Sequence, residues 1–401
     1  MSALLAVDPL FDGGLDGSVL LVVAVKVAIA FALLLVAVML YIWGMRKVIA
    51  DMQNRIGPAN AGPYGVLQTL ADGIKLFFKE QSIPVTADRP VFRLAPYLSI
   101  LPAFLMFCVV PVGGQVSIFG HRTYLQVADL PVGVLFVLAM SGLGVYGVML
   151  AGWSSGSKYP LLGSVRASAQ MLSYEAAFGL AILGVLVQAG TLSTRAIVDE
   201  QAWIDWQSIA SEWYWLPALV PFAIFLVAAV AETNHPPFDL VEAEQELVGG
   251  FHTEYTGIRF AIFFLAEFMN LITMSAVAVT LFLGGPSGPS LGFLSADHVV
   301  NTWLVPVLWF VAKVLVLLFG TVWLRASLPR LRYDRLMALG WKYLIEIAIL
   351  WVLVSVSVVV AREEGWNVAL TAVAASAAAL AAYGVLWLAI PKAGEQVEEF
   401  R

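Results

Sequence analysis

The stretch AETNHPPFDLVEAEQELVGGFHTEYTG, Ala231 to Gly257, governs how the rest of the chain is interpreted. It joins two long apolar segments and carries six acidic residues, while a seventh acid, Glu267, follows inside the second segment. The six are Glu232, Asp239, Glu242, Glu244, Glu246 and Glu254. Acids placed between membrane spans lose water and need partners, so they are rare unless function retains them. We therefore interpret the remaining chain as a scaffold that presents this stretch.

Composition indicates an all-α polytopic membrane protein. Of 401 residues, 60% are hydrophobic and only 12% are charged, whereas about a quarter of a soluble domain is charged. The single cysteine, Cys108, cannot hold an iron–sulfur cluster alone. The four histidines lack zinc-ligand spacing, and there is no glycine-rich phosphate motif. We expect no metal and no redox cofactor on this chain, so another chain must carry any electrons.

Apolar runs of about 20 residues, the length that spans a bilayer, predict nine transmembrane helices within a single membrane domain, 1–401. The expected spans are 18–43, 94–114, 131–153, 168–190, 213–231, 258–284, 303–324, 338–361 and 367–390. The last is alanine-rich and is expected to be a peripheral helix facing lipid. The chain shows no internal repeat, which counts against common transporter architectures.

Lys and Arg gather in the segments 44–93, 154–167 and 325–342, which places those segments in the cytoplasm. The N-terminus is then outside and the C-terminus inside, and the acidic loop 232–257 is cytoplasmic despite its negative charge. Within loop 44–93, apolar residues recur at three- and four-residue spacing over 63–79. This pattern predicts a short amphipathic helix on the membrane surface, which could be an ordinary interfacial anchor or part of a site.

The acidic loop supports two interpretations. Asp239 followed by Glu242 predicts a short helix starting near Leu240, with Glu242 and Glu246 four residues apart on one face. The loop is either a solvated helix start that favours the helix dipole or a proton-handling cluster, because crowded and poorly hydrated carboxyls cannot all ionise. Ionisable residues also lie inside expected spans, as static ion pairs or as a polar route. They are Lys26, Glu175, Glu267, Lys313 and Glu346.

Basic residues form a second set on the expected cytoplasmic side. The set comprises Arg46, Arg55, Lys75, Lys79, Arg325, Arg330, Arg332 and Arg335. Nucleic-acid binding is disfavoured because no such motif accompanies them. They serve either to anchor the protein to anionic lipid or to dock an acidic soluble partner.

Six motifs, taken in order, resemble one known family. They are QNRIGP (Gln53–Pro58), LADGIKLFFKE (Leu70–Glu80), KYPLLGSVRASAQMLSYE (Lys158–Glu175), PFDLVEAEQEL (Pro237–Leu247), EYTG (Glu254–Gly257) and RASLPRLRYDRLMALGWK (Arg325–Lys342). Together they resemble the H-subunit family of bacterial NADH–quinone oxidoreductase, respiratory complex I. The resemblance runs from about residue 18 to 361, so the final span lies outside the common eight-span core.

The resemblance implies a membrane subunit without a redox centre that forms the membrane side of the quinone chamber. Quinone would enter between the first and sixth spans and the amphipathic helix. The resemblance assigns proton coupling to Glu175, Asp239, Glu242, Glu244, Glu246, Glu254 and Glu267. It assigns the chamber and the subunit junction to Arg46, Arg55, Asp72, Lys75, Lys79, Phe238 and Arg325.

The implied partners are the other complex I subunits. Those of the peripheral arm carry NADH, FMN and iron–sulfur clusters, and small membrane subunits lead to the antiporter-like pumps; the substrate is ubiquinone or menaquinone, and the location is the bacterial inner membrane. Three positions depart from the family pattern: Met45 where an acid is common, His235 where Arg is common, and Val241 where Pro is usual. The rival interpretations are the membrane anchor of an energy-converting hydrogenase, a stand-alone proton-coupled transporter, and a purely structural anchor.

Overall fold

The computed structural model describes residues 8–11, 14, 16–201, 218–239, 249–289 and 300–389. Within these ranges, eight helical stretches are long and apolar enough to cross a membrane. They are α1 (Gly17–Met52), α3 (Arg89–Cys108), α4 (Gly133–Ser154), α5 (Lys158–Ala189), α10 (Ile258–Phe282), α11 (Val305–Ser327) with the π-helical turn Val300–Leu304 before it, α12 (Tyr333–Leu339) continuing through the π-helical turn Gly340–Leu344 into α13 (Ile345–Glu363), and α14 (Val368–Ala389). The predicted all-α polytopic class is confirmed.

The remaining elements are short. The expected span 213–231 corresponds to α8 (Leu219–Glu232), an apolar helix of 14 residues. Because residues 202–217 lie outside the described ranges, a ninth full span stays a prediction. The others are α2 (Gln68–Phe78), α6 (Thr194–Glu200), three 3-10 turns (Pro9–Phe11, Pro63–Gly65, Gly250–His252) and an antiparallel hairpin of β1 (Gln115–Ile118) and β2 (His121–Tyr124), which the apolar pattern did not indicate.

Two helices run well beyond the apolar segments that predicted them. Helix α1 continues to Met52 rather than ending near residue 43, and α5 begins at Lys158 rather than near residue 168. Hydropathy predicts a helix end where charged side chains begin, but the backbone hydrogen bonds of α1 and α5 continue into the charged segments. Consequently Arg46 lies on a helix, and Glu175 lies 17 residues into α5, roughly 25 Å along its axis at 1.5 Å per residue.

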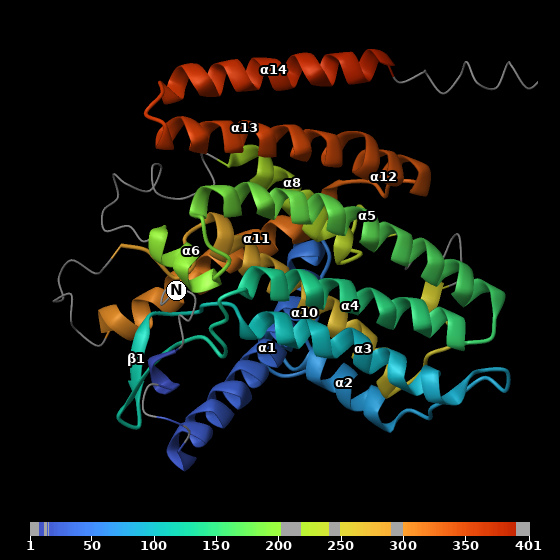
Figure 1. The fold of residues 1–401 in the computed structure, drawn as a ribbon. Helices are drawn as coiled ribbons and strands as arrows, with labels where there is room; N and C mark the ends of the chain where they lie inside the picture. The colour runs from blue at the N-terminus through green and yellow to red at the C-terminus, as the bar shows by residue number, and fades with distance from the viewer. Residues whose placement is uncertain are drawn as a thin grey trace, which may run out of the picture.

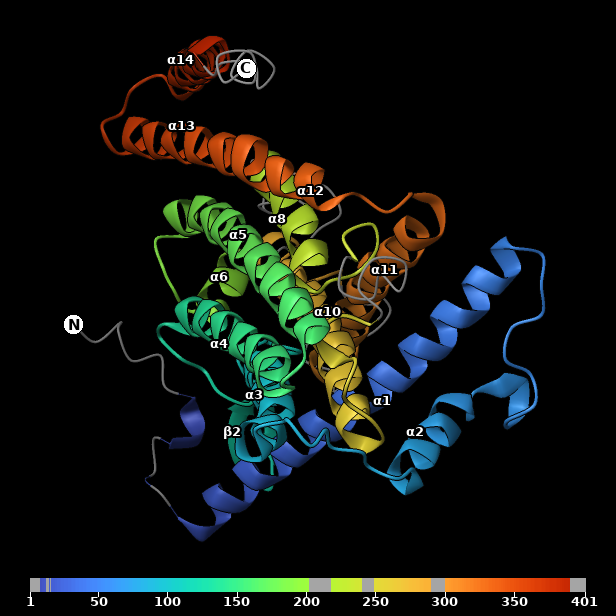
Figure 2. The same ribbon diagram turned by 90° about the vertical axis from the view of Figure 1, so that its right-hand side faces the viewer.

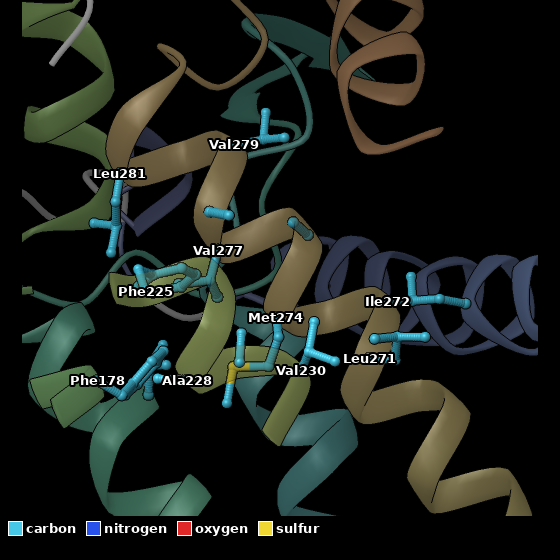
Figure 3. Packing of buried hydrophobic residues seen from close by; sticks show 14 of the residues in the cluster. Phe178, Phe225, Ala228, Val230, Leu271, Ile272, Met274, Val277, Val279 and Leu281 are labelled. Atoms are coloured by element: carbon cyan, nitrogen blue, oxygen red, sulfur yellow. The ribbon is translucent and has the colours of Figure 1, made fainter. Parts of the chain in front are cut away.

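Helices α5 and α10 occupy the middle of the bundle, and α1 crosses its lower side with α2 beside it (Figures 1 and 2). In the most apolar part of α10, 72% of residues are buried within the molecule, against none in α14. Helix α14 lies outermost, next to α13 (Figure 1). Figure 3 shows the core, where Phe178 of α5, Phe225 of α8 and Met274 of α10 come together. Most of α10 is therefore enclosed by protein.

The predicted amphipathic surface helix is present as α2, preceded by the 3-10 turn at Pro63. No residue of α2 is buried, and Phe77 and Phe78 are exposed. Polar contacts hold this segment against α1: the Thr69 hydroxyl donates to the Met39 carbonyl at 3.3 Å, and the Trp43 indole donates to the Tyr64 carbonyl at 3.1 Å. Helix α2 thus lies on the surface of the bundle.

Lys26 and Lys313, the two lysines inside spans, have static polar partners. Lys26 Nζ forms an ion pair with Asp8 at 2.9 Å and donates to the Thr123 hydroxyl at 2.8 Å. Lys313 Nζ donates to three backbone carbonyls just beyond α10, those of Leu283, Gly285 and Ser287, at 2.6–2.9 Å. For these two residues, the structural interpretation of a buried charge suffices.

We expect Asp8→Asn to lower the stability of the chain by about 3–5 kcal/mol, because it leaves the buried Lys26 ammonium without a counter-charge. Thermal unfolding of the detergent-purified protein measures the effect. Asp199→Asn is the matched control: that carboxylate pairs with Arg195 but is largely exposed, so its loss should cost less than about 1 kcal/mol. Equal melting temperatures for the two variants would contradict the prediction.

Candidate functional site

A cavity of about 550 Å³ between α1, α10 and α11, here called the α1–α10 cavity, brings together several sequence-predicted site residues. Four predicted residues line it, namely Arg46, Arg55, Glu267 and Arg325. Its other lining residues are mainly apolar: Ile42, Met45, Ile49, Ile56, Gly57, Pro58, Phe264 and Phe268. An apolar cavity with a few converging polar groups is the usual form of a small-molecule site.

An ion pair ties α2 to the edge of this cavity. Arg46 Nη1 lies 2.8 Å from Asp72 Oδ2, and the Gln68 amide donates to Asp72 Oδ1 at 3.2 Å. Both charged groups are partly exposed, so the pair contributes little to stability. Its effect is positional, because it orients a guanidinium group of the cavity. Lys75 of α2 and Lys79, the residue directly after α2, are exposed and do not line the cavity.

Met45 lies where an acid was expected from the resemblance. Its side chain is buried and lines the α1–α10 cavity, with Arg325 Nη1 3.8 Å from the sulfur. A thioether is only a weak hydrogen-bond acceptor, so Met45 does not neutralise Arg325 as a carboxylate would.

A second, smaller space of about 60 Å³ lies deeper between α3, α4, α5, α8 and α10, here called the inner cavity. Its polar lining residues are Ser99, Ser141, Glu232, Thr233, Asn234, Asp239, Glu267 and Asn270. Glu267 lines both cavities. A single carboxyl on α10 therefore stands between a large apolar cavity and a polar one.

The turn after α8 is held in place by α5. The Gln170 amide donates to the carbonyls of Ala231 and Phe238 at 2.7 and 2.9 Å and to the Asn234 side chain at 3.2 Å. Buried Asp239 forms an ion pair with Arg330 at 3.1 Å. Phe238 packs against the Tyr174 ring and lies in the core rather than in the α1–α10 cavity.

His235, in the same turn, is fully enclosed. Its Nδ1 lies 2.9 Å from the Thr233 carbonyl and 3.5 Å from Glu267 Oε1, and its ring meets the Phe268 ring edge-on. Burial lowers the pKa of His235 to about 4; the Thr233 hydrogen bond opposes this shift, and the positive charge of Arg325 adds to it. The imidazole is therefore neutral at pH 7.

Glu232, the last residue of α8, continues the series of acids away from Glu267. It is buried, accepts a hydrogen bond from the Ser141 hydroxyl, and is close enough to Glu175 for the two charges to repel each other. The absence of a side chain at Gly142 leaves space for the Glu175 carboxyl, because a Cβ at residue 142 would lie 2.9 Å from Glu175 Oε1. Glu175 also lines an open apolar groove of about 570 Å³ along α4 and α5.

Of the remaining predicted acids, Glu254 alone lies within the described residues. Glu242, Glu244 and Glu246, together with Val241 and the helix expected near Leu240, lie outside the described residues. Glu254 is half-buried and lines neither cavity. Conversely, sequence reasoning counted Glu232 in the acidic stretch but gave it no role. The sequence did contain a signal, because Glu232 is the last residue of an apolar segment. In a membrane protein that position buries the carboxyl, whereas the end of a helix in a soluble protein would expose it.

These features define the class: an integral membrane protein of packed helices that encloses carboxyls and histidine between two internal cavities. The chain belongs to the NADH dehydrogenase family, whose model matches residues 25–356. It is 55% identical to the H subunit of the NADH-quinone oxidoreductase of Frankia alni over 87% of this chain and 75% of that protein. It is 48% identical to the protein of the same name in Streptomyces avermitilis, over 86% and 75%. The family predicted from the motifs is confirmed, and with it the assignment as a membrane subunit of an oxidoreductase complex.

Proposed function

We propose that this chain forms the membrane side of the quinone-binding chamber in a proton-pumping NADH–quinone oxidoreductase and couples quinone reduction to proton movement. The observation that carries the proposal is the position of Glu267, which lines both the α1–α10 cavity and the inner cavity. Chemistry in the first cavity can therefore change the charge of a group that faces the second.

The α1–α10 cavity suits a quinone. Its apolar side chains match the ring and the isoprenoid tail, and the guanidinium groups of Arg46, Arg55 and Arg325 can donate hydrogen bonds to carbonyl oxygens. Reduction of a quinone to a quinol takes two electrons and two protons. The electrons come from the iron–sulfur subunits of the peripheral arm, while this chain positions the substrate and excludes water.

The inner cavity suits proton transfer. Three of its lining residues, Ser99, Glu232 and Asn270, each carry a buried oxygen with no hydrogen-bond partner among the described residues. Buried polar atoms without partners are costly, and this space has room for a few water molecules with polar partners. Water there links Glu267 to Glu232. Because Glu232 and Glu175 repel each other, the pair favours holding one proton between them, next to the groove that Glu175 lines on α4 and α5.

The charges on the surface give the orientation and the partners. Exposed Lys75 of α2 and Lys79 directly after it lie near the acidic loop, because the Ser82 N–H donates to the Thr256 hydroxyl at 2.9 Å. Half-exposed Arg330 lies beside Asp239 of the same loop. We assign the end of the bundle that carries the acidic loop to the cytoplasm under the positive-inside rule, where the peripheral-arm subunits dock. The groove containing Glu175 faces the membrane subunits that lead to the pumps.

Filling the α1–α10 cavity tests the quinone assignment. We expect Met45→Trp to raise the KM for quinone at least about tenfold in the assembled complex, because the indole occupies space next to Arg325 and a lost ligand contact of ~1.4 kcal/mol is worth a factor of ten. Leu33→Trp, on the lipid-facing side of the same helix, should leave the KM unchanged. Inhibitor-sensitive NADH–quinone reductase activity in proteoliposomes measures both.

Three results would redirect the assignment. An unchanged KM in Met45→Trp would move quinone out of this cavity. Co-purification of the native chain with a nickel–iron subunit, rather than with flavin and iron–sulfur subunits, would favour the hydrogenase anchor. Proton transport by the purified lone chain in liposomes would favour the stand-alone transporter.

A further inference from the structure

His235 is the buried titratable group that the proposed route leaves unused. Its Nδ1 faces the Thr233 carbonyl at 2.9 Å and Glu267 Oε1 at 3.5 Å. A carbonyl oxygen can only accept a hydrogen bond, so the neutral ring carries its proton on Nδ1. The other nitrogen, Nε2, is then the basic one.

Nε2 is placed to take up a proton. It is buried and has no hydrogen-bond partner among the described residues. Burial opposes a positive charge on this ring and lowers the pKa of His235 to about 4, so protonation of Nε2 needs the field of a nearby carboxylate. The edge-on contact with Phe268, with ring centres 5.2 Å apart, holds the ring in this orientation.

Two opposite charges face the ring from other helices. Glu267 approaches from α10, and Arg325 from α11 disfavours the imidazolium form. Glu267 shares the α1–α10 cavity with Arg46 of α1, and it shares the inner cavity with Asp239 and Glu232. Glu267 is the acid that approaches the ring within ion-pair distance, so the charge on Glu267 governs whether His235 holds a second proton.

We propose that His235 is a positioning residue that compensates the charge of Glu267 during turnover. The inference rests on the proposed function. When Glu267 gives its proton to the α1–α10 cavity, the new carboxylate favours the imidazolium, and Nε2 takes one proton from water of the inner cavity, which the neighbouring residues Thr233 and Asn234 line. When Glu267 is reprotonated, Nε2 returns its proton to the same water and the ring goes back to its Nδ1–H form. Over the cycle His235 gains and loses one proton, and Glu267 passes one on.

The charged state of His235 is therefore transient. Burial lowers the pKa of His235 to about 4, so the ring is neutral at pH 7 until a negative charge on Glu267 favours the imidazolium. Because the imidazole becomes charged only beside a carboxylate, loss of the proton from Glu267 is unfavourable until a second proton can reach His235. An arginine at this position, always charged, would stabilise the ionised form of Glu267 and remove this requirement.

Infrared difference spectra of the assembled complex, recorded on quinone reduction with ring-labelled histidine, test the inference. We expect an imidazolium band in the wild type that disappears in His235→Gln and also in Glu267→Gln. His252→Gln is the matched control, because burial lowers the pKa of His252 to about 4 as well, yet its ring packs between Phe251 and Phe260 and forms no ion pair with a carboxylate of the described residues. That variant should retain the band.

The pH profile gives a second readout. Wild-type turnover should fall by up to about tenfold per pH unit on the alkaline side, because Nε2 must gain a proton, and His235→Gln should flatten that limb. An unchanged band and profile in His235→Gln overturns the inference. If at the same time Glu267→Gln abolishes pumping, the proposed function stands without this role for His235. If Glu267→Gln pumps normally, the proposed function itself fails.

Discussion

Glu232→Gln is expected to lower coupled proton pumping at least about tenfold in the assembled complex. Glutamine fits the same space and still accepts the hydrogen bond from Ser141, but it cannot exchange a proton. A positioned proton-transfer group typically contributes roughly 10²- to 10⁴-fold to the rate, so a tenfold loss is a conservative expectation. Proton uptake and NADH oxidation, measured together in proteoliposomes, give the ratio of protons pumped to electrons transferred.

The position of Glu232 explains why its effect should be large. It lies between Glu267, which shares the inner cavity with it, and Glu175, whose charge it senses. The exposed acid Glu363, at the end of α13, is the control, and Glu363→Gln should pump normally. Normal pumping by Glu232→Gln in a fully assembled complex would mean that protons bypass the inner cavity.

Apolar length predicted the helices, but it could not predict where the site residues meet. The spans around α4, α10 and α14 were predicted to within a few residues, because about 20 apolar residues leave few alternatives. The end of α1 and the start of α5 were not, because both helices continue beyond the apolar segments into residues with charged side chains. The hairpin of β1 and β2 carries no strong periodic signal over its four-residue strands.

The site itself depends on contacts between residues far apart in the chain. Arg46 and Arg325 line one cavity, and Ser141 meets Glu232, only because of the rotation and crossing angles of the packed helices. Ridge-and-groove packing allows several such angles, and a single sequence does not choose among them. The resemblance pointed to Arg46 and Arg325 for the chamber and to Glu267 for proton coupling, but the inner cavity and the place of Glu232 follow from the packing.

Gly163→Ala is expected to destabilise the protein and disturb coupling, although alanine is the better helix former by about 1 kcal/mol. Gly163 lies on α5, where a Cβ would come within 2.8 Å of the backbone of Gly250 and 3.0 Å of the nitrogen of Phe251. Those atoms are main chain and cannot rotate away, so α5 and the 3-10 turn Gly250–His252 must separate. Overpacking of this kind costs typically about 1–3 kcal/mol.

The sign of this effect can be tested against a second glycine on the same helix. At Gly179 a Cβ meets nothing within 4 Å, so Gly179→Ala should be neutral or slightly stabilising through helix propensity alone. Thermal unfolding of both variants therefore gives shifts of opposite sign. Separation of α5 from the 3-10 turn Gly250–His252 also moves Gln170 of α5, whose side chain holds the segment that carries His235 and Asp239. Proton pumping by Gly163→Ala should therefore fall even where the complex assembles. Equal stability of the two variants would show that α5 and the turn adjust without cost, and the close approach would then not be what positions the acids.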